Sequence, residues 1–212
     1  MGLFYQHYIN ETTRLGVWRI EEPEEFFLQK VLLHNEVSHP YKRLQHLAGR
    51  YLLPTLFNDF PLKEILIADT RKPFLVDELY HFSVAHCGNF AAAIVSKKNR
   101  VGVDIEFVTP RIQRISSKFL NDTEHIFLEE WQHLTQLYLQ LVTVVWSSKE
   151  AIFKWYGNGE VNFKNHIELS GEVVFHADEW IELPFVFRKS EGVAVTVFAR
   201  LFQGLVLAWV IT

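Results

Sequence analysis

One short segment, residues 101–106, strongly limits the folds open to this chain. Its sequence is Val-Gly-Val-Asp-Ile-Glu, so that branched apolar residues alternate with Gly102, Asp104 and Glu106. A period of two is typical of a β-strand, and it places both carboxylates on the same face, about 7 Å apart along the chain. Burying both as anions is unfavourable without a counter-ion. The segment therefore predicts a strand that brings two acids to one site.

A second segment, Trp146 to Lys154, predicts a helix. Apolar residues recur near a period of 3.6 from Val142 onward, and Glu150 and Lys154 are four residues apart, hence neighbours on one side. Taken alone, Glu150 and Lys154 are more often an exposed ion pair that only stabilises its helix. Asp104 and Glu106 alone could equally lie on the solvated face of an edge strand. Together the segments offer three acids and a lysine to one site.

An all-oxygen ligand set of this kind is what a divalent cation such as Mg²⁺ prefers, with open positions for water and a phosphate. A bound cation would also supply the counter-charge that two buried carboxylates require. The pattern therefore suggests phosphate chemistry.

The two segments resemble the 4′-phosphopantetheinyl transferases, and specifically the larger monomeric type that activates surfactin synthetase and similar assembly lines. That family carries G-[VI]-D-[VI]-E and, roughly forty residues later, W-[SCT]-x-K-E-[AS]-x-x-K; residues 102–106 and 146–154 fit both. Residues 72–74 look like the family's G-K-P-x segment, and residues 82–88 look like its F-N-[IV]-S-H-S segment. The resemblance covers about residues 42–162.

The resemblance implies an α+β fold of two similar halves forming a pseudo-dimer, with the active site in the cleft between them. We expect an N-terminal half over residues 1–108 and a C-terminal half over residues 109–212. The implied reaction is transfer of the 4′-phosphopantetheine group of coenzyme A to a serine of an acyl or peptidyl carrier protein, releasing adenosine 3′,5′-bisphosphate.

The family also implies roles for the four central residues. Asp104, Glu106 and Glu150 would hold Mg²⁺ or Mn²⁺, and Lys154 would contact a phosphate oxygen of the leaving group. Glu150 could instead be the general base for the carrier serine, and the sequence leaves both roles open. Two other functions also stay open: a non-catalytic regulator that binds coenzyme A or a carrier protein, and a magnesium-dependent phosphohydrolase.

Cationic residues of the first half are expected to bind the coenzyme. His86 and Lys72 are placed like the family's histidine and lysine of the coenzyme pocket, and three further basic residues lie on the predicted helix 41–57, namely Lys42, Arg43 and Arg50. A lone histidine is more often a core residue, and surface solubility is the alternative for the helix cations. Ala85 and Cys87 stand where the family usually has serines, so we expect altered phosphate contacts and retained chemistry.

The start of the second half is expected to dock the carrier. Arg111, Arg114 and Lys118 are spaced as a basic helical stripe, beside Phe119 and Leu120, which could engage an apolar patch on an acidic partner. The alternative is a solvated stripe whose neighbouring aromatic residues face the core.

Composition excludes several other classes. The formal net charge of −4 argues against a nucleic-acid partner. Neither a signal peptide nor a membrane-spanning run is apparent, and a single cysteine among 212 residues suits a reducing compartment, so a cytoplasmic location is expected. Analogy with the family favours a monomer.

Hydrophobic periodicity predicts a helix-plus-sheet plan in each half. In the first half we expect strands at 3–9, 16–20, 65–68, 80–85, 90–96 and 101–106, and helices at 24–34 and 41–57, the latter interrupted at Pro54. In the second half we expect helices at 112–119, 122–131 and 134–156, and strands at 167–169, 172–175, 185–188, 193–198 and 205–211.

Overall fold

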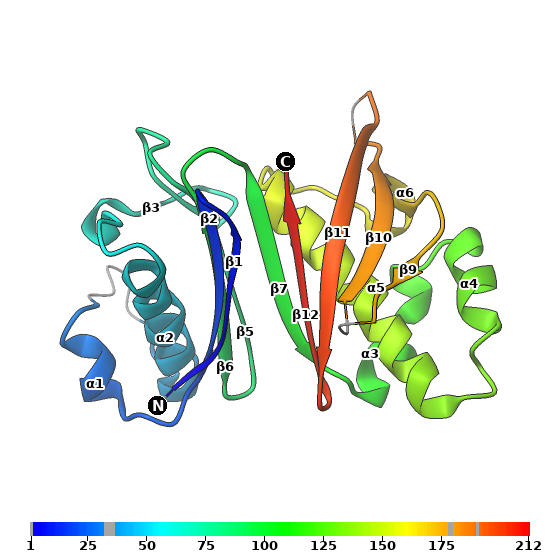
Figure 1. The fold of residues 1–212 in the computed structure, drawn as a ribbon, viewed down its shortest axis with the longest axis horizontal. Coiled ribbons are helices and arrows are strands. Elements are labelled where there is room, and N and C mark those ends of the chain that lie inside the picture. Colours follow the sequence, from blue (N-terminus) through cyan, green and yellow to red (C-terminus); the bar gives the residue numbers. More distant parts are fainter. Residues whose placement is uncertain (1, 32–36, 178–179, 190) are drawn as a thin grey trace. The chain divides into compact units, whose positions relative to one another are not determined.

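The computed structural model describes residues 2–31, 37–177, 180–189 and 191–212, and it has the expected α+β composition (Figure 1). It divides into two compact units, Met1–Ile105 and Glu106–Thr212. The boundary between the units falls within strand β7 (Val101–Phe107), whereas the sequence predicted it after residue 108. Along the described chain, no helix has the length and hydropathy needed to cross a membrane.

The first unit contains a four-stranded antiparallel sheet in the order β1-β2-β6-β5. Its strands are β1 (Leu3–Asn10), β2 (Thr13–Arg19), β5 (His81–Cys87) and β6 (Phe90–Ser96). The small side chains of β6 from Ala91 to Ala93 are fully buried. They leave room for helix α2 (Pro40–Leu56), which packs along this sheet (Figure 1).

Helix α2 begins with Pro40, whose fixed φ and missing N–H suit the first helical position. Leu47, Leu52 and Leu53 lie on its buried face and are 0% exposed. The expected interruption at Pro54 is wrong, because the helix continues to Leu56. Pro54 lies in the last turn, so that it removes only one helical hydrogen bond, and the amide of Phe57 still donates to the carbonyl of Leu53 at 3.0 Å.

The helix and the sheet approach most closely at Gly49. A Cβ atom at this position would lie 2.5 Å from Cγ1 of Val84 on β5, closer than two carbon atoms can approach without displacement. Only a residue without a side chain allows this contact. Gly49 therefore fixes the distance between α2 and β5.

Short elements complete the first unit. They are α1 (Glu24–Leu28), the 3₁₀ turn η1 (Leu62–Glu64), β3 (Leu66–Ile67) and β4 (Pro73–Phe74), of which the last two pair as a hairpin. Helix α1 ends well before the predicted residue 34, and residues 32–34 of that prediction lie outside the described part of the chain.

The second sheet has the order β7-β12-β11-β10-β8, with β9 also paired to β10. The strands are β8 (Ile167–Leu169), β9 (Val174–Phe175), β10 (Trp180–Phe187), β11 (Val193–Phe202) and β12 (Leu205–Ile211). From Leu205 to Val210, strand β12 is buried on both faces, which explains its unbroken apolar sequence. The long helix α5 (Thr135–Tyr156) packs on β12 and β11.

The remaining helices of the second unit are α3 (Pro110–Arg114), the 3₁₀ turn η2 (Ser116–Lys118), α4 (Asp122–Glu129) and α6 (Phe163–His166). The predicted continuous helix 112–119 is wrong, because Ile115 leaves the helical conformation with φ −102° and ψ 6°. Helix α5 ends as its sequence suggests, at Gly157 with φ +76°.

Candidate active site

Strand β7 carries the first two acids as expected. Asp104 is 4% exposed and Glu106 is half-buried. Within the first unit, the backbone amide of Val103 donates to Oγ of Ser83 at 3.2 Å, which ties β7 to β5. Asp104 belongs to the first unit and Glu106 to the second.

Helix α5 presents the other two candidate residues. Glu150 and Lys154 are half-buried and one turn apart, so they lie on the same side of the helix. One turn earlier, Trp146 packs against Phe119 and Phe163, with ring centroids 5.0 and 5.6 Å away.

The indole of Trp146 also links α5 to β7 inside the second unit. Its Nε1 donates to Oε1 of Glu106 over a long 3.5 Å. This contact brings Glu106 to the helix face that carries Glu150. Residues that are 44 positions apart in sequence thus share one region of the second unit.

The candidate oxygen donors suit Mg²⁺ or Mn²⁺ in their chemistry, since Asp104, Glu106 and Glu150 are all carboxylates. Among the residues that the structure describes, no three His, Cys, Asp or Glu side chains gather closely enough to hold a metal ion by themselves. Mg²⁺ is usually bound by one or two carboxylates together with water and substrate phosphate. The residues therefore fit a cation that arrives with a phosphorylated substrate.

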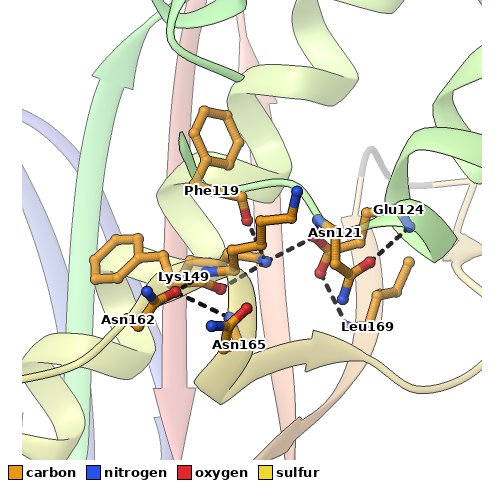
Figure 2. A network of polar contacts seen from close by, with 9 residues as sticks. Phe119, Asn121, Glu124, Lys149, Asn162, Asn165 and Leu169 are labelled. Carbon is orange, nitrogen blue, oxygen red and sulfur yellow. Dashed lines mark hydrogen bonds and ion pairs between the residues drawn. The ribbon is translucent and has the colours of Figure 1, made fainter. Parts of the chain in front are cut away.

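Lys149, next to Glu150, is fully buried. Figure 2 shows the polar contacts around it. Its Nζ donates to Oε2 of Glu124 at 2.7 Å and to the carbonyls of Phe119 and Phe163 at 2.7 and 2.9 Å. All three N–H bonds of an ammonium group thus have acceptors. Burial lowers the pKa of Lys149, and the carboxylate of Glu124 opposes this effect.

Glu124 is 0% exposed. Figure 2 shows its further partners, Asn121 and Leu169. Its Oε2 accepts from the amide of Asn121 at 2.9 Å, closing the capping box of α4, and its Oε1 accepts from the amide of Leu169 at 3.1 Å. The Lys149–Glu124 pair therefore connects α5 to the start of α4, to β8 and to the first residue of α6. This network holds the helix turn on which Glu150 lies.

A cavity of about 460 Å³ in the first unit has cationic and apolar walls. Its polar lining comes from His46 and Arg50 of α2, His86 of β5 and Arg71 of the turn before β4. The rings of His46 and His86 are edge to face, with centroids 5.1 Å apart. Desolvation lowers the pKa of His46, and the positive charges of Arg50 and Lys42 add to this effect. Such a site attracts an anion.

Lys72 lines a second cavity of about 410 Å³ in the first unit, together with Arg100 and Tyr80. Pro73 and Phe82 line both cavities. Burial lowers the pKa of Lys72 to about 8, and the charge of Arg100 contributes. Two of the expected coenzyme residues, Arg50 and His86, thus share one cavity while Lys72 lies in another.

The other expected coenzyme residues do not line these cavities. Nε of Arg43 donates to Oε1 of Glu24 at 2.8 Å, and its Nη1 donates to the carbonyl of Val37 at 3.3 Å, so that Arg43 ties α2 to α1. Lys42 is exposed. Ala85 is 3% exposed and lies on the opposite face of β5 from His86, away from the 460 Å³ cavity.

At the start of the second unit, Arg111, Arg114 and Lys118 are exposed, but they lie on two short elements, α3 and η2. Phe119 and Leu120 were expected to face a carrier protein, and this expectation is wrong. They are 1% and 0% exposed, because they pack into an apolar cluster with Ile112 of α3 and residues of α4 and α5. Only the basic residues remain available at the surface.

Sequence reasoning missed His46, Arg71 and the Lys149–Glu124 pair. His46 precedes Arg50 by one helical turn, a spacing that could have indicated a shared face. Arg71 occupies the position that the G-K-P pattern gives to glycine, and its φ of +65° is the left-handed conformation that glycine favours. The burial of Lys149 has no signal in the local sequence.

Comparison with known proteins finds similar sequences. Residues 100–195 match the sequence model of the 4′-phosphopantetheinyl transferase superfamily. The putative 4′-phosphopantetheinyl transferase of Haemophilus influenzae is 31% identical over 135 residues, 60% of this chain and 55% of that protein. The 4′-phosphopantetheinyl transferase AcpT of Escherichia coli K12 is 31% identical over 128 residues, 59% and 64% of the two chains.

A third relative is enterobactin synthase component D of Escherichia coli K12, which is 30% identical over 116 residues, 53% of this chain and 54% of that protein. The matched regions thus span between 54% and 64% of these three relatives. The superfamily match includes both β7 and α5, which carry all four central candidates.

Proposed function

We propose that this protein transfers the 4′-phosphopantetheine group of coenzyme A to a serine of an acyl or peptidyl carrier protein. The superfamily match at residues 100–195 carries the proposal, because it includes both the strand of Asp104 and Glu106 and the helix of Glu150 and Lys154. The hydrogen bond between Trp146 and Glu106 links this strand to this helix. In the reaction the serine oxygen forms a bond to the β-phosphorus of coenzyme A. The bond to the leaving phosphate breaks, and adenosine 3′,5′-bisphosphate departs.

The carboxylates have two tasks in this scheme. Asp104, Glu106 and Glu150 would hold Mg²⁺ or Mn²⁺, which when bound neutralises the pyrophosphate charge. Glu150 alternatively takes the proton of the serine hydroxyl, because a carboxylate beside the incoming hydroxyl can serve as a base. Lys154 is one turn further along α5, and its ammonium stabilises the negative charge that develops on the leaving phosphate.

The cavities of the first unit support coenzyme binding. Arg50 and His86 suit the phosphate on the ribose, and Lys72 suits a second anionic group in the adjoining cavity. Lys42 and Arg43 belong to the same proposal, with Arg43 contributing mainly by holding α2 against α1. Protonation of these groups favours the coenzyme, which is strongly anionic.

The carrier protein is proposed to contact Arg111, Arg114 and Lys118, which offer positive charge to an acidic partner. The chain is proposed to act as a cytoplasmic monomer of the larger type that activates surfactin synthetase. Two of the relatives are named AcpT and enterobactin synthase component D, and neither name refers to surfactin synthetase.

Intact-mass spectrometry of a panel of apo carrier proteins tests the proposal. The protein is incubated with each carrier, coenzyme A and Mg²⁺, and a parallel reaction contains a metal chelator. We expect one serine to gain the mass of a phosphopantetheine group, and adenosine 3′,5′-bisphosphate to appear in equal amount. Release of the bisphosphate without any carrier would instead identify a phosphohydrolase. Coenzyme binding without either product would identify a regulator.

Four variants locate the chemistry. Asp104→Ala and Glu150→Ala should abolish transfer in a folded protein, because they remove a carboxylate that would hold the cation or, for Glu150, take the serine proton. Lys154→Ala should slow transfer severely, because it removes the positive charge proposed to stabilise the leaving phosphate. Gln136→Ala, at an exposed position of the same helix, is the matched control and should retain full activity. Near-normal turnover of Asp104→Ala with Mg²⁺ present would refute the metal assignment.

The docking surface is tested separately. Arg111→Glu combined with Arg114→Glu should raise KM for the carrier and leave coenzyme binding unchanged, because both residues lie outside the coenzyme cavities. Equal kinetics for the double variant and the unchanged protein would exclude this surface.

A further inference from the structure

Arg71 combines a strained backbone with a place in the 460 Å³ cavity. The amide of Arg71 donates to the carbonyl of Ala68 at 2.8 Å, and the amide of Ala68 donates to the carbonyl of Lys72 at 2.9 Å. This tight turn joins β3 to β4 and requires φ +65° at Arg71. A residue with a Cβ atom adopts this conformation at a cost, and such strain is concentrated at ligand sites.

Arg50 approaches the same cavity from α2. Its Nη1 is buried, and it has no hydrogen-bond partner within the part of the chain that the structure describes. Burial also lowers the pKa of the Arg50 guanidinium. A buried donor without an acceptor is unfavourable, and a phosphate oxygen is the acceptor that best matches a guanidinium group.

The rest of the cavity wall limits the kind of anion. Its apolar lining includes Ile65, Ile67 and Val84, which suit the base of a nucleoside better than a free inorganic ion. Among the described residues that line the cavity, the charged and titratable ones are His46, Arg50, Arg71 and His86, and none of these is acidic. A nucleotide with a dianionic phosphate monoester fits both walls.

We propose that Arg71 binds the 3′-phosphate of coenzyme A together with Arg50 and thereby sets the preference of this chain for the 3′-phosphorylated coenzyme. The identity of the ligand rests on the proposed function, whereas the phosphate site itself rests on the cavity. Arg71 contributes through its side chain, since any residue that tolerates φ +65° could form the turn. Replacing arginine by glycine therefore separates binding from folding.

The test compares coenzyme A and dephospho-coenzyme A by calorimetric titration of the full chain. Arg71→Gly should weaken coenzyme A binding about ten-fold or more, as expected for loss of a charged hydrogen bond, and leave dephospho-coenzyme A within about two-fold. The midpoint of thermal unfolding should stay equal or rise, because glycine relieves the left-handed strain. Arg71→Lys should keep part of the preference, since it retains the charge but not the planar fork.

Glu160→Gly is the matched control. Glu160 is also a non-glycine residue with positive φ, 51°, but it lies in the second unit with a side chain that is 93% exposed. Its replacement should leave the affinity for both coenzymes unchanged.

Two results would overturn the inference. One is an unchanged ratio of the two affinities in Arg71→Gly, and the other is an unmodified chain that binds both coenzymes equally. Failure of the proposed function looks different: the chain would prefer coenzyme A through Arg71 yet modify no carrier. Conversely, carrier modification with equal coenzyme affinities in the arginine and glycine forms would leave the function intact and remove the role of Arg71.

Discussion

Breaking the buried Lys149–Glu124 pair is expected to destabilise the second unit strongly. In Lys149→Met the aliphatic part of the side chain is kept, so that little volume is lost, but the ammonium is removed. Glu124 then keeps its two backbone donors and loses its cation, while the carbonyls of Phe119 and Phe163 lose a donor at 2.7 and 2.9 Å. Removing one partner of a buried ion pair typically costs about 3–5 kcal/mol.

This loss should be visible in thermal and chemical unfolding. For a chain of this size, 1 kcal/mol corresponds to about 2–4 °C, so the midpoint should fall by about 6–20 °C. Urea unfolding, followed by tryptophan fluorescence and circular dichroism, gives the free energy of unfolding directly. Lys98→Met, at an exposed lysine of the first unit, is the control and should change it by less than about 0.5 kcal/mol.

A double variant tests the cause. In Lys149→Met with Glu124→Gln the uncompensated charge is absent, and we expect about half of the lost stability or more to return. A loss below about 1 kcal/mol in the single variant would place this pair with exposed ion pairs and refute the reasoning. So would a double variant less stable than Lys149→Met alone.

Three further predictions concern the site. A bound phosphate should reverse the lowering of the His46 pKa, so coenzyme binding should take up protons near neutral pH and should strengthen as the pH falls. Calorimetry in two buffers of different ionisation enthalpy measures this proton uptake, and His46→Gln should reduce it. Identical binding enthalpies in both buffers would contradict the prediction. Lys72, whose pKa is about 8, should be acetylated by limiting reagent at pH 8 faster than Lys98, because a larger share of its amine is neutral at this pH. Peptide mass spectrometry measures the labelling of both lysines. Equal labelling would count against the low pKa of Lys72. Trp146→Phe keeps the ring contacts but removes the hydrogen bond to Glu106. We therefore expect kcat to fall about two- to ten-fold, with little change in the midpoint of thermal unfolding. An unchanged kcat would show that this contact does not position Glu106.

Apolar patterning was sufficient to predict the buried elements. Strands β6, β8 and β12 have the predicted bounds, and α5 begins one residue after its predicted start. Strands β6 and β12 are mostly continuous apolar runs, β8 alternates Ile-Glu-Leu with both apolar residues buried, and α5 is a long helix with a regular period, so that burial and sequence pattern coincide. Helix α5 ends at the predicted residue, Tyr156, and is followed by Gly157 in the left-handed conformation.

Long-range contacts were not predictable in the same way. Strand β10 begins at Trp180, not at residue 185, because Glu182 and Pro184 on its less buried face hide the pattern. The partner of Arg43 is Glu24, 19 residues earlier, and only the packing of α1 against α2 reveals it.

The site shows the same division between local and distant information. The motif of residues 146–154 contains two lysines, and the sequence offers no means of telling that Lys149 is fully buried while Lys154 is half-buried. Phe119 and Leu120 follow a basic stripe, yet their direction is set by Ile115 leaving the helix. Charge spacing thus identified surface cations correctly and could not assign their apolar neighbours.

The close approach at Gly49 has a consequence for engineering this protein. Gly49 precedes Arg50 directly and lies three residues after His46, while Val84, which it touches, lines the same cavity as both. A methyl group at position 49 would push α2 away from β5 and widen the cavity without altering any charge. Coenzyme preference could therefore be tuned from inside the hydrophobic core, by the size of one side chain that the ligand never meets.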